Sequence, residues 1–161
     1  MLKPDGFDIA LLKALSTNAR SSHVELADAV GLSSTACARR VAALEADGFI
    51  EGYQARLGLS ALGLGATVII RITLNSQSDE ALDEFESAVG RCPSVLRCFL
   101  MSGTDDYQVT VVARGIEDFE RIHRTELSRL PHVARIQSNF AIREVVDRAF
   151  PPVALLPASA D

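Results

Sequence analysis

The stretch Ser22-His-Val-Glu-Leu-Ala-Asp-Ala-Val-Gly-Leu-Ser-Ser-Thr-Ala-Cys-Ala-Arg-Arg-Val-Ala-Ala-Leu-Glu-Ala-Asp-Gly48 decides the fold of the N-terminal part of this chain. Leu26 and Val30 have helical spacing, and Gly31 is the residue type that ends a helix in the left-handed conformation. A second helix begins almost at once, so the sequence predicts two short helices joined by a tight turn. A helix-turn-helix uses this arrangement to place its second helix in the major groove of DNA.

The second of these helices is predicted to have two distinct faces. Ser33 is its expected N-cap, because a serine hydroxyl accepts a hydrogen bond from the first helical turn. The apolar face consists of Cys37, Val41 and Leu44. At about 100° per residue, Thr35, Arg39 and Ala42 point the opposite way. A helix with such a small polar outer face fits a DNA groove.

The candidate DNA contacts are hydroxyl and guanidinium side chains in and near this helix: Arg20, Ser33, Ser34, Thr35, Arg39 and Arg40. Thr35 and Arg39 lie one turn apart, which suits a base edge or a phosphate. Ser33 has a purely structural alternative as the helix cap. Arg40 lies on the flank, where it can pair with Glu45 or reach a phosphate. Arg20 would touch the DNA backbone from the start of the first helix of the pair, or stay solvated.

The composition excludes several classes of protein. With 161 residues and 48% hydrophobic content, the chain can build a packed core and is not a disordered protein. It has no apolar run of membrane-spanning length, and its first eight residues lack the apolar core of a secretory signal. We therefore expect a cytoplasmic protein with no membrane partner.

The cysteines and histidines give no sign of a metal or cofactor. Cys37, Cys92 and Cys98 form no complete disulfide framework and have no metal-binding spacing. Buried free thiols are the favoured interpretation, and a redox pair of Cys92 and Cys98 is the alternative. The three histidines, His23, His123 and His132, are dispersed. We predict no metal site and no cofactor.

The charge of the chain bears on how it could bind DNA. The net charge is −5, and residues 1–56 carry six basic and seven acidic side chains. Such a balance argues against nonspecific coating of DNA, which depends on many phosphate contacts. It still allows site-specific binding, in which each subunit makes a few well-positioned contacts with DNA and an oligomer repeats these contacts.

The C-terminal half has a different pattern, which follows a glycine-rich hinge at 58–65. Strands are expected at 67–74, 95–101, 107–113 and 133–146, and helices at 78–89 and 116–130. The order strand, helix, strand, strand, helix, strand is typical of a ferredoxin-like sandwich, with one four-stranded sheet and both helices on one face. The other face is uncovered, and a second copy of the chain is its economical partner.

The predicted fold class is therefore α+β. An N-terminal helix-turn-helix domain, winged-helix-like with a first helix at 8–18 and a strand at 49–57, is joined to a C-terminal ferredoxin-like βαββαβ sandwich. The predicted boundaries are 1–57 for the DNA-binding domain, 58–65 for the hinge, 66–146 for the effector-binding and oligomerisation domain, and 147–161 for a tail. The Pro-rich tail cannot be a regular helix; it lies across a neighbouring surface or is loose.

Several short stretches occur in an order and spacing that one known family shares. They are Asp8–Leu15, Asn18–Arg20, Glu25–Ala27, Val30–Ser33, Ala36–Val41, Leu44–Glu45, Gly48–Tyr53, Ser102–Gly103, Asp106–Tyr107 and Leu130–Pro131. Through them the chain resembles the Lrp/AsnC, or feast/famine, transcription regulators over almost its whole length. The resemblance implies a helix-turn-helix domain, a ligand-sensing domain, and an amino acid or related metabolite as effector. It also implies homodimers that assemble further, commonly to octamers.

The same resemblance points to a loop at 103–107 as part of the effector cleft at a junction between dimers. The candidate effector-binding residues are Gly103, Thr104, Asp105, Asp106 and Tyr107, with Ser138 as a companion. Backbone N–H groups of the loop would take a carboxylate, and Asp105 or Asp106 an ammonium group. From composition alone, the loop is a plain hairpin turn, since Gly and Asp suit turns without any function.

Three classes of function remain to be compared. The leading one is a sequence-specific regulator that binds double-stranded DNA and responds to an amino acid or related metabolite. A low-specificity architectural DNA-binding protein is the alternative, but the near-neutral charge and only two lysines speak against it. An enzyme is disfavoured, because the sequence has no paired acid and base, no activated nucleophile and no phosphate loop.

Overall fold

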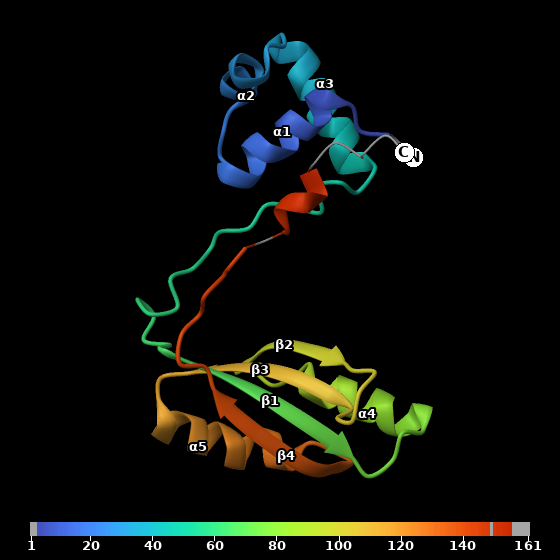
Figure 1. The fold of residues 1–161 in the computed structure, drawn as a ribbon, viewed down its shortest axis with the longest axis vertical. Helices are drawn as coiled ribbons and strands as arrows, with labels where there is room; N and C mark the ends of the chain where they lie inside the picture. The colour runs from blue at the N-terminus through green and yellow to red at the C-terminus, as the bar shows by residue number, and fades with distance from the viewer. Residues whose placement is uncertain (1–2, 149, 156–161) are drawn as a thin grey trace. The chain divides into compact units, whose positions relative to one another are not determined.

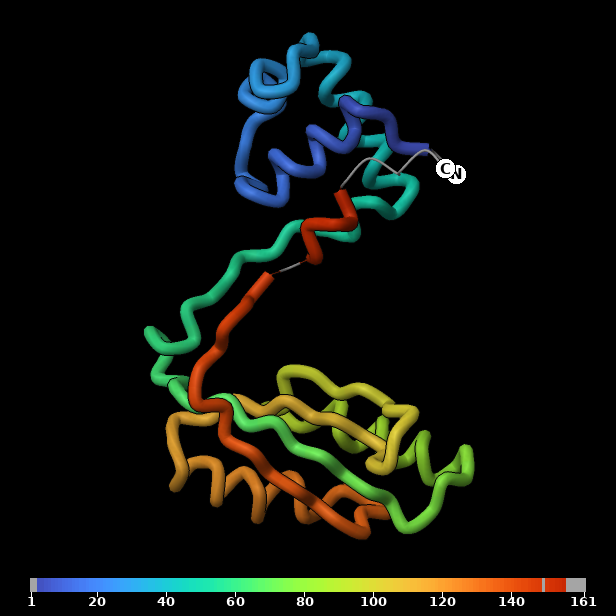
Figure 2. Tube along the Cα trace, viewed as in Figure 1, coloured from blue at the N-terminus to red at the C-terminus, as the bar shows by residue number. Residues whose placement is uncertain are grey.

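The computed structural model describes residues 3–148 and 150–155. The described residues form two compact units, one made of those up to Arg56 together with those from Asp147 onward, the other of Leu57–Val146. Figure 2 follows the chain from the first unit into the second and back again. No helix in the described part of the chain is long and apolar enough to cross a membrane.

The first unit is built from three helices, α1 at Gly6–Thr17, α2 at His23–Val30 and α3 at Ser34–Ala46 (Figure 1). Ser22 and Ser33 cap the N-termini of α2 and α3 as predicted, each accepting a backbone N–H of the first turn. Gly31 ends α2 with a φ of 72°, the left-handed conformation that suits glycine. The helices share one core of buried residues: Leu11, Leu15, Leu26, Ala27, Cys37, Val41 and Leu44.

The first helix begins earlier than the hydrophobic pattern indicated. Asp5 is the N-cap, and its side chain accepts hydrogen bonds from the N–H groups of Phe7 and Asp8. The Asp8 carboxylate in turn accepts the N–H of Asp5 at 3.0 Å, which completes a capping box. Asp8 therefore belongs to the first turn of α1 and does not precede it.

The strand expected at 49–57 does not form. These residues have no strand pairing in the structure and belong to none of the four strands of the sheet. A side-chain contact holds the segment instead: the Tyr53 hydroxyl donates a 2.8 Å hydrogen bond to Glu45 on α3. Burial raises the pKa of Tyr53 to about 12, with a further contribution from Glu45.

The second unit has the βαββαβ order that was predicted. Its elements are β1 at Ala66–Leu74, α4 at Asp79–Val89, β2 at Val95–Leu100, β3 at Tyr107–Ala113, α5 at Ile116–Thr125, the short 3-10 helix η1 at Leu127–Arg129, and β4 at Val133–Phe140. All neighbouring strands are antiparallel, in the sheet order β2-β3-β1-β4. The structure confirms the ferredoxin-like sandwich.

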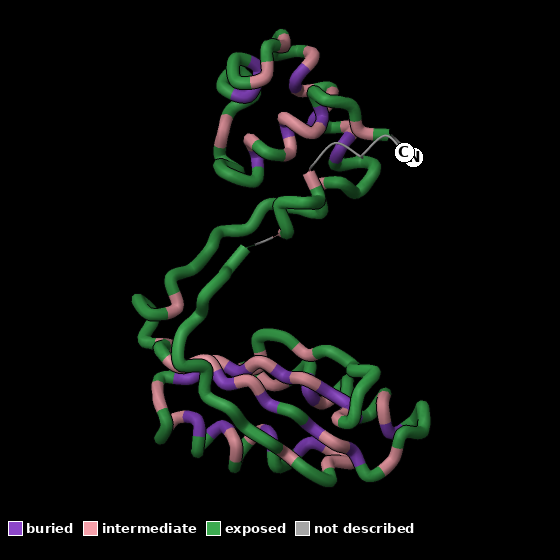
Figure 3. Tube along the Cα trace, viewed as in Figure 1, coloured by how far each residue is buried: buried purple, intermediate pink, exposed green. Residues whose placement is uncertain are grey.

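Side-chain alternation along the strands decides which face of the sheet is covered. Val68, Ile70 and Ile72 of β1 are fully buried, and they form one core with Phe85 of α4 and Ile122 of α5. Figure 3 shows the resulting alternation of buried and partly buried residues along β1 and β3. Both helices thus cover one face, and the opposite face, here named the open face, is covered by no described element of the second unit.

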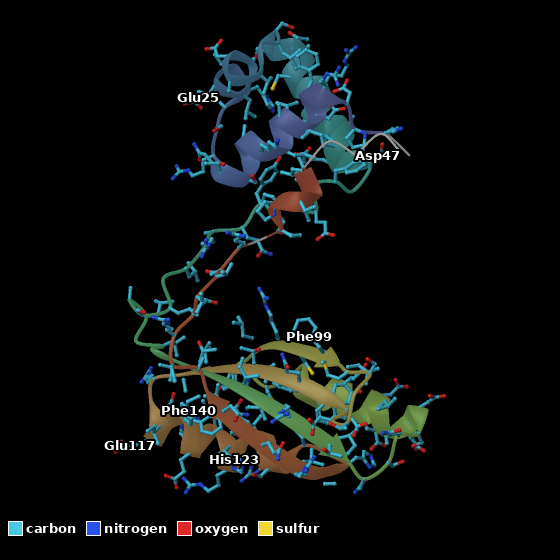
Figure 4. All side chains as sticks on the ribbon, viewed as in Figure 1. Glu25, Asp47, Phe99, Glu117, His123 and Phe140 are labelled. Atoms are coloured by element: carbon cyan, nitrogen blue, oxygen red, sulfur yellow. The ribbon has the colours of Figure 1, made fainter. Side chains whose placement is uncertain are left out.

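Two aromatic residues mark the two faces. Phe140 of β4 lies on the helix side, with its ring edge-to-face against Phe119 of α5 at 5.2 Å between centroids. Phe99 of β2 pairs with Gln108 in the strand register and belongs to the open face, where it is 49% exposed. Figure 4 shows the two rings on opposite sides of the sheet.

Several expected boundaries in the second unit are wrong. The helix starting at Ile116 ends at Thr125 and gives way to η1, and Ile116 itself is 74% exposed. Ile116 is the first residue of α5, where the helix has not yet reached the core. Strand β4 stops at Phe140, and one further backbone hydrogen bond to β1, from the Ala141 N–H to the Thr67 carbonyl, follows it.

The described part of the tail joins the first unit. Residues Pro152–Leu155 form a short 3-10 turn, η2, in contact with α1. Asp147 forms an exposed ion pair with Arg56 inside the same unit. All three cysteines are free, and burial raises the pKa of each thiol.

Candidate DNA interface and effector loop

The helix α3 presents the outer face that the sequence predicted. Thr35, Arg39 and Ala42 are exposed, while the opposite side of the helix is buried in the core of the first unit. Among the described residues, none forms an ion pair or hydrogen bond with the Arg39 guanidinium. Arg39 therefore points to solvent from a rigid helix and can meet a base edge or a phosphate.

The hydroxyl candidates divide into a cap and free side chains. The Ser33 hydroxyl accepts the Ala36 N–H at 3.2 Å, so its cap role is observed and any DNA contact would share the same oxygen. Ser34 and Thr35 are exposed in the first turn of α3. Arg20 is exposed in the turn before α2, where its own N–H donates to the Asn18 side chain at 3.1 Å.

Arg40 is placed differently from the expectation. Its guanidinium lies 2.8 Å from the Asp8 carboxylate and 2.9 Å from that of Asp5, and it is not paired with Glu45. The guanidinium also lies over the Phe7 ring, 5.5 Å from the centroid. Hydrogen bonds that the guanidinium donates to the carboxylates of Asp8 and then Asp5 raise the pKa of Arg40.

This network gives Arg40 a structural role, while its assignment as a DNA contact stays a prediction. Asp8 is 3% exposed, so the pair connects α3 to a nearly buried carboxylate at the N-terminus of α1. Arg40 thus ties α3 to the N-terminus of α1 within the first unit. Sequence reasoning missed Asp5 and Asp8 because they lie more than thirty residues from Arg40 and nothing local connects them.

The effector loop is fastened to the sheet by Asp106. Its carboxylate is 8% exposed and accepts the Leu74 N–H at 2.7 Å and the Gln77 side-chain amide at 2.6 Å. Its own N–H donates to the Ile72 carbonyl at 2.9 Å. Both carboxylate oxygens therefore accept a hydrogen bond from the fold, so Asp106 has a structural role in the loop, and its assignment to an effector stays a prediction.

Two further effector candidates also lie away from the loop surface. Tyr107 is 1% exposed; its hydroxyl donates to Glu86 at 2.8 Å and its ring packs on Phe85. Burial, and then the Glu86 carboxylate, raise the pKa of Tyr107 far above its usual range. Ser138 lies on β4 and pairs with Ile70 of β1, so β1 separates it from β3. Its side chain points to the face of the sheet that the helices cover. The structure does not bring Ser138 to the loop.

The remaining loop residues stay at the surface. Gly103 and Thr104 are exposed, and Asp105 is partly buried between the side chains of Arg71 and Arg135. These two arginines and Thr73 were missed in the sequence, because only the strand register brings them together. The loop therefore has a charged neighbour on the open face of the sheet.

A cavity lies at the end of the sheet opposite the loop 103–107, and none of the predicted effector residues lines it. That cavity has a volume of about 380 Å³, and its polar lining residues are Ser94, Arg114, Asp118 and Arg121. Asp118 is engaged there by the Arg114 N–H and the Arg121 guanidinium, which lower the pKa of its carboxyl. The described residues contain no group of three or more His, Cys, Asp or Glu that could hold a metal ion.

Two family models match the chain, one for each unit. A model described as winged helix-turn-helix DNA-binding matches residues 4–51, and a model described as Lrp/AsnC ligand binding domain matches residues 67–149. The first match covers α1 to α3, and the second covers the sheet with the loop at 103–107.

Similar proteins extend over nearly the whole chain. The Bkd operon transcriptional regulator of Pseudomonas aeruginosa is 36% identical over 95% of this chain and 100% of its own. The leucine-responsive regulatory protein of Rhizobium meliloti is 34% identical over 89% of this chain and 92% of its own. A transcriptional regulator of Neisseria meningitidis, solved as a complex with L-methionine, aligns with a TM-score of 0.89 and 30% identity, covering 96% of this chain and 100% of its own.

Proposed function

The chain belongs to the Lrp/AsnC family of transcription regulators, and on this premise we propose that it binds specific DNA sequences and that an amino acid or related metabolite alters its DNA binding or its assembly. The observation that carries the DNA half of the proposal is the outer face of α3. Thr35 and Arg39 are exposed one turn apart on a helix whose other side is core. Specificity then comes from few contacts, in keeping with the near-neutral charge.

The effector half of the proposal is supported by the second unit. It matches a ligand-binding domain model, and one relative is named leucine-responsive while one similar structure contains L-methionine. We propose that this chain takes a ligand of the same class at the loop 103–107. Gly103, Thr104 and Asp105 are the loop residues whose position suits direct contact.

A homodimer formed through the open face is part of the proposal. Phe99 is half exposed there and Ile69 and Val112 are partly buried, so the face offers apolar area that a second copy would cover. A dimer presents two copies of α3 to DNA, which doubles each operator contact. We further propose that the dimers assemble to an octamer. We also propose that the protein works in the cytoplasm, where DNA and amino acids are available.

The experiment that tests the proposal selects operators and then adds ligands. Full-length protein is used to enrich binding sites from a random DNA duplex pool, and affinity is measured for the enriched site and for bulk genomic DNA. We expect a specificity ratio of at least ~1,000 and a change in affinity or assembly with at least one proteinogenic amino acid. A ratio near one would favour an architectural protein, and no response to any amino acid would remove the effector half.

A further inference from the structure

The cavity of about 380 Å³ lies at the end of the sheet where β1 begins and β3 ends, and it is called the end cavity below. Its apolar wall is formed by Leu64, Pro93 and Val112. Its polar wall is formed by Ser94, Arg114, Asp118 and Arg121. A cavity of this volume is large enough for a small metabolite.

The charged residues of the end cavity lie outside the strands of the sheet. Arg114 follows β3, and Asp118 and Arg121 lie one turn apart on α5. Leu64 precedes β1, and among the lining residues only Val112 belongs to a strand. The exposure of the two arginines is therefore not exposure of the open face, where a second copy is proposed to pack.

The one carboxylate that lines the end cavity is already used by the fold. Asp118 Oδ2 accepts the Arg114 N–H at 3.0 Å, and Asp118 Oδ1 accepts the Arg121 Nη2 and Nε groups at 2.7 and 3.0 Å. The Arg114 N–H, and then the Arg121 guanidinium, lower the pKa of this carboxyl. Asp118 is thus ionised and paired, so it offers no free oxygen to an ammonium group.

The two guanidinium groups still have unused donors. Within the described part of the chain, no hydrogen bond or ion pair engages the Arg114 guanidinium, which is exposed. The Arg121 side chain is 53% exposed and directs two of its three nitrogens at Asp118. Two positive side chains and one negative side chain leave the lining with one net positive charge.

The other lining residues limit what such a site can hold. The Ser94 hydroxyl donates to Glu126 at 2.9 Å, so its proton is not available to a ligand. Guanidinium groups bind carboxylates through paired, charge-assisted hydrogen bonds. An ammonium group would meet two positive charges and no free carboxylate. The three apolar side chains can instead cover a short hydrocarbon chain.

We propose that the end cavity binds a small carboxylate that has a short apolar chain and no ammonium group. The ligand carboxylate lies on Arg114 and Arg121, and its apolar chain lies against Leu64, Pro93 and Val112. Short monocarboxylic acids and α-oxo acids have this chemistry. The site is separate from the loop 103–107, so it goes beyond the proposed function. Since Leu64 belongs to the glycine-rich segment before β1, an occupant touches the segment that leads into the sheet.

The test measures the uptake of radiolabelled isovalerate by the full-length protein in equilibrium dialysis. Unlabelled competitors separate the two parts of the ligand. Isovaleramide lacks the negative charge and should compete at least ~10-fold more weakly than isovalerate. Acetate and inorganic phosphate lack the apolar chain and should also compete at least ~10-fold more weakly.

Variants connect the uptake to the end cavity. Arg114→Gln and Arg121→Gln should each weaken isovalerate at least ~10-fold and isovaleramide much less. Leu64→Ser should weaken isovalerate and leave acetate unchanged. Arg124→Gln, which removes an exposed arginine of α5 that does not line the cavity, is the matched control and should bind like the wild type. Circular dichroism melting of each variant shows that its fold is kept.

Three results would overturn the proposal. The first is a wild type that takes up neither isovalerate nor its α-oxo acid at millimolar concentration. The second is equal binding of isovalerate by the wild type and both arginine variants. The third is full displacement of the probe by excess L-leucine, which would assign the probe to the amino-acid site of the proposed function. A protein that binds isovalerate but responds to no amino acid would keep this site while the effector half of the proposed function fails.

Discussion

The guanidinium of Arg40 lies 2.8 Å from the carboxylate of Asp8 and joins the helix α3 to the first turn of α1. Asp8 is nearly buried, so Asp8→Ala removes both an acceptor of the capping box and the partner of Arg40. We expect a loss of about 2 kcal/mol in the free energy of unfolding. Urea unfolding measures it, and a value equal to the wild type would mean that the pair does not position α3.

The cap of α1 should also give the stability a dependence on pH. Hydrogen bonds from the Asp8 N–H first, and then the Arg40 guanidinium, hold the pKa of the Asp5 carboxyl below its ordinary value of 3.8. Because the folded pKa is depressed, the stabilisation is fully present above pH 3.8 and is lost as the pH falls through the lower, folded value. Asp5→Asn keeps a capping oxygen but cannot ionise. The stability difference between wild type and Asp5→Asn should therefore shrink below pH 3.8; a difference that stays constant with pH would contradict the assignment.

Local signals in the sequence were sufficient for much of the first unit. Ser22, Gly31 and Ser33 act within one helical turn of their own position, so the turn between α2 and α3 could be predicted without the rest of the chain. The strand at 49–57 was wrong for a related reason. A strand depends on a partner segment, which the residues of the strand itself cannot specify.

The candidate site was harder to predict, because its key contacts are long-range. Arg40 and Asp8 are far apart in the chain, and so are Asp105 and Arg71, so neither pairing leaves a periodic signal. The hydrogen bonds of Asp106 are long-range as well. Its residue type and loop position suggested an ammonium site, and they gave no sign that Leu74 of β1 and Gln77, which follows β1, each donate a hydrogen bond to one of its oxygens.

Asp106→Ala should act on the fold of the loop before it acts on a ligand. The substitution leaves the buried Leu74 N–H without its acceptor, which costs about 1–3 kcal/mol of stability in the second unit. Effector response should be lost while ligand-free DNA binding at low temperature is kept. Thermal unfolding together with gel-shift assays checks both parts. Asp106→Asn, which retains one acceptor, should recover part of the stability; an Ala variant as stable as the wild type would show that the anchor is unimportant.

The proposed dimer contact through the open face predicts that a charge placed on this face will weaken assembly. Phe99 is the large aromatic residue of that face, and Phe99→Asp would place a charge where a second copy is proposed to pack. Sedimentation velocity should show a shift from dimers or larger assemblies toward monomers. Val24→Asp, at another exposed apolar side chain on α2, is the matched control and should leave the assembly unchanged. Equal sedimentation of wild type and Phe99→Asp would place the interface elsewhere.

The central claim is that α3 reads DNA through its outer face, and Arg39→Ala tests it most directly. Arg39 is exposed and has no partner among the described residues, so its removal should leave the unfolding free energy within about 0.5 kcal/mol of the wild type. In a gel-shift titration with the enriched operator, we predict that binding weakens about ten- to hundredfold, while the oligomeric state is unchanged. An affinity for the operator equal to that of the wild type would contradict the account.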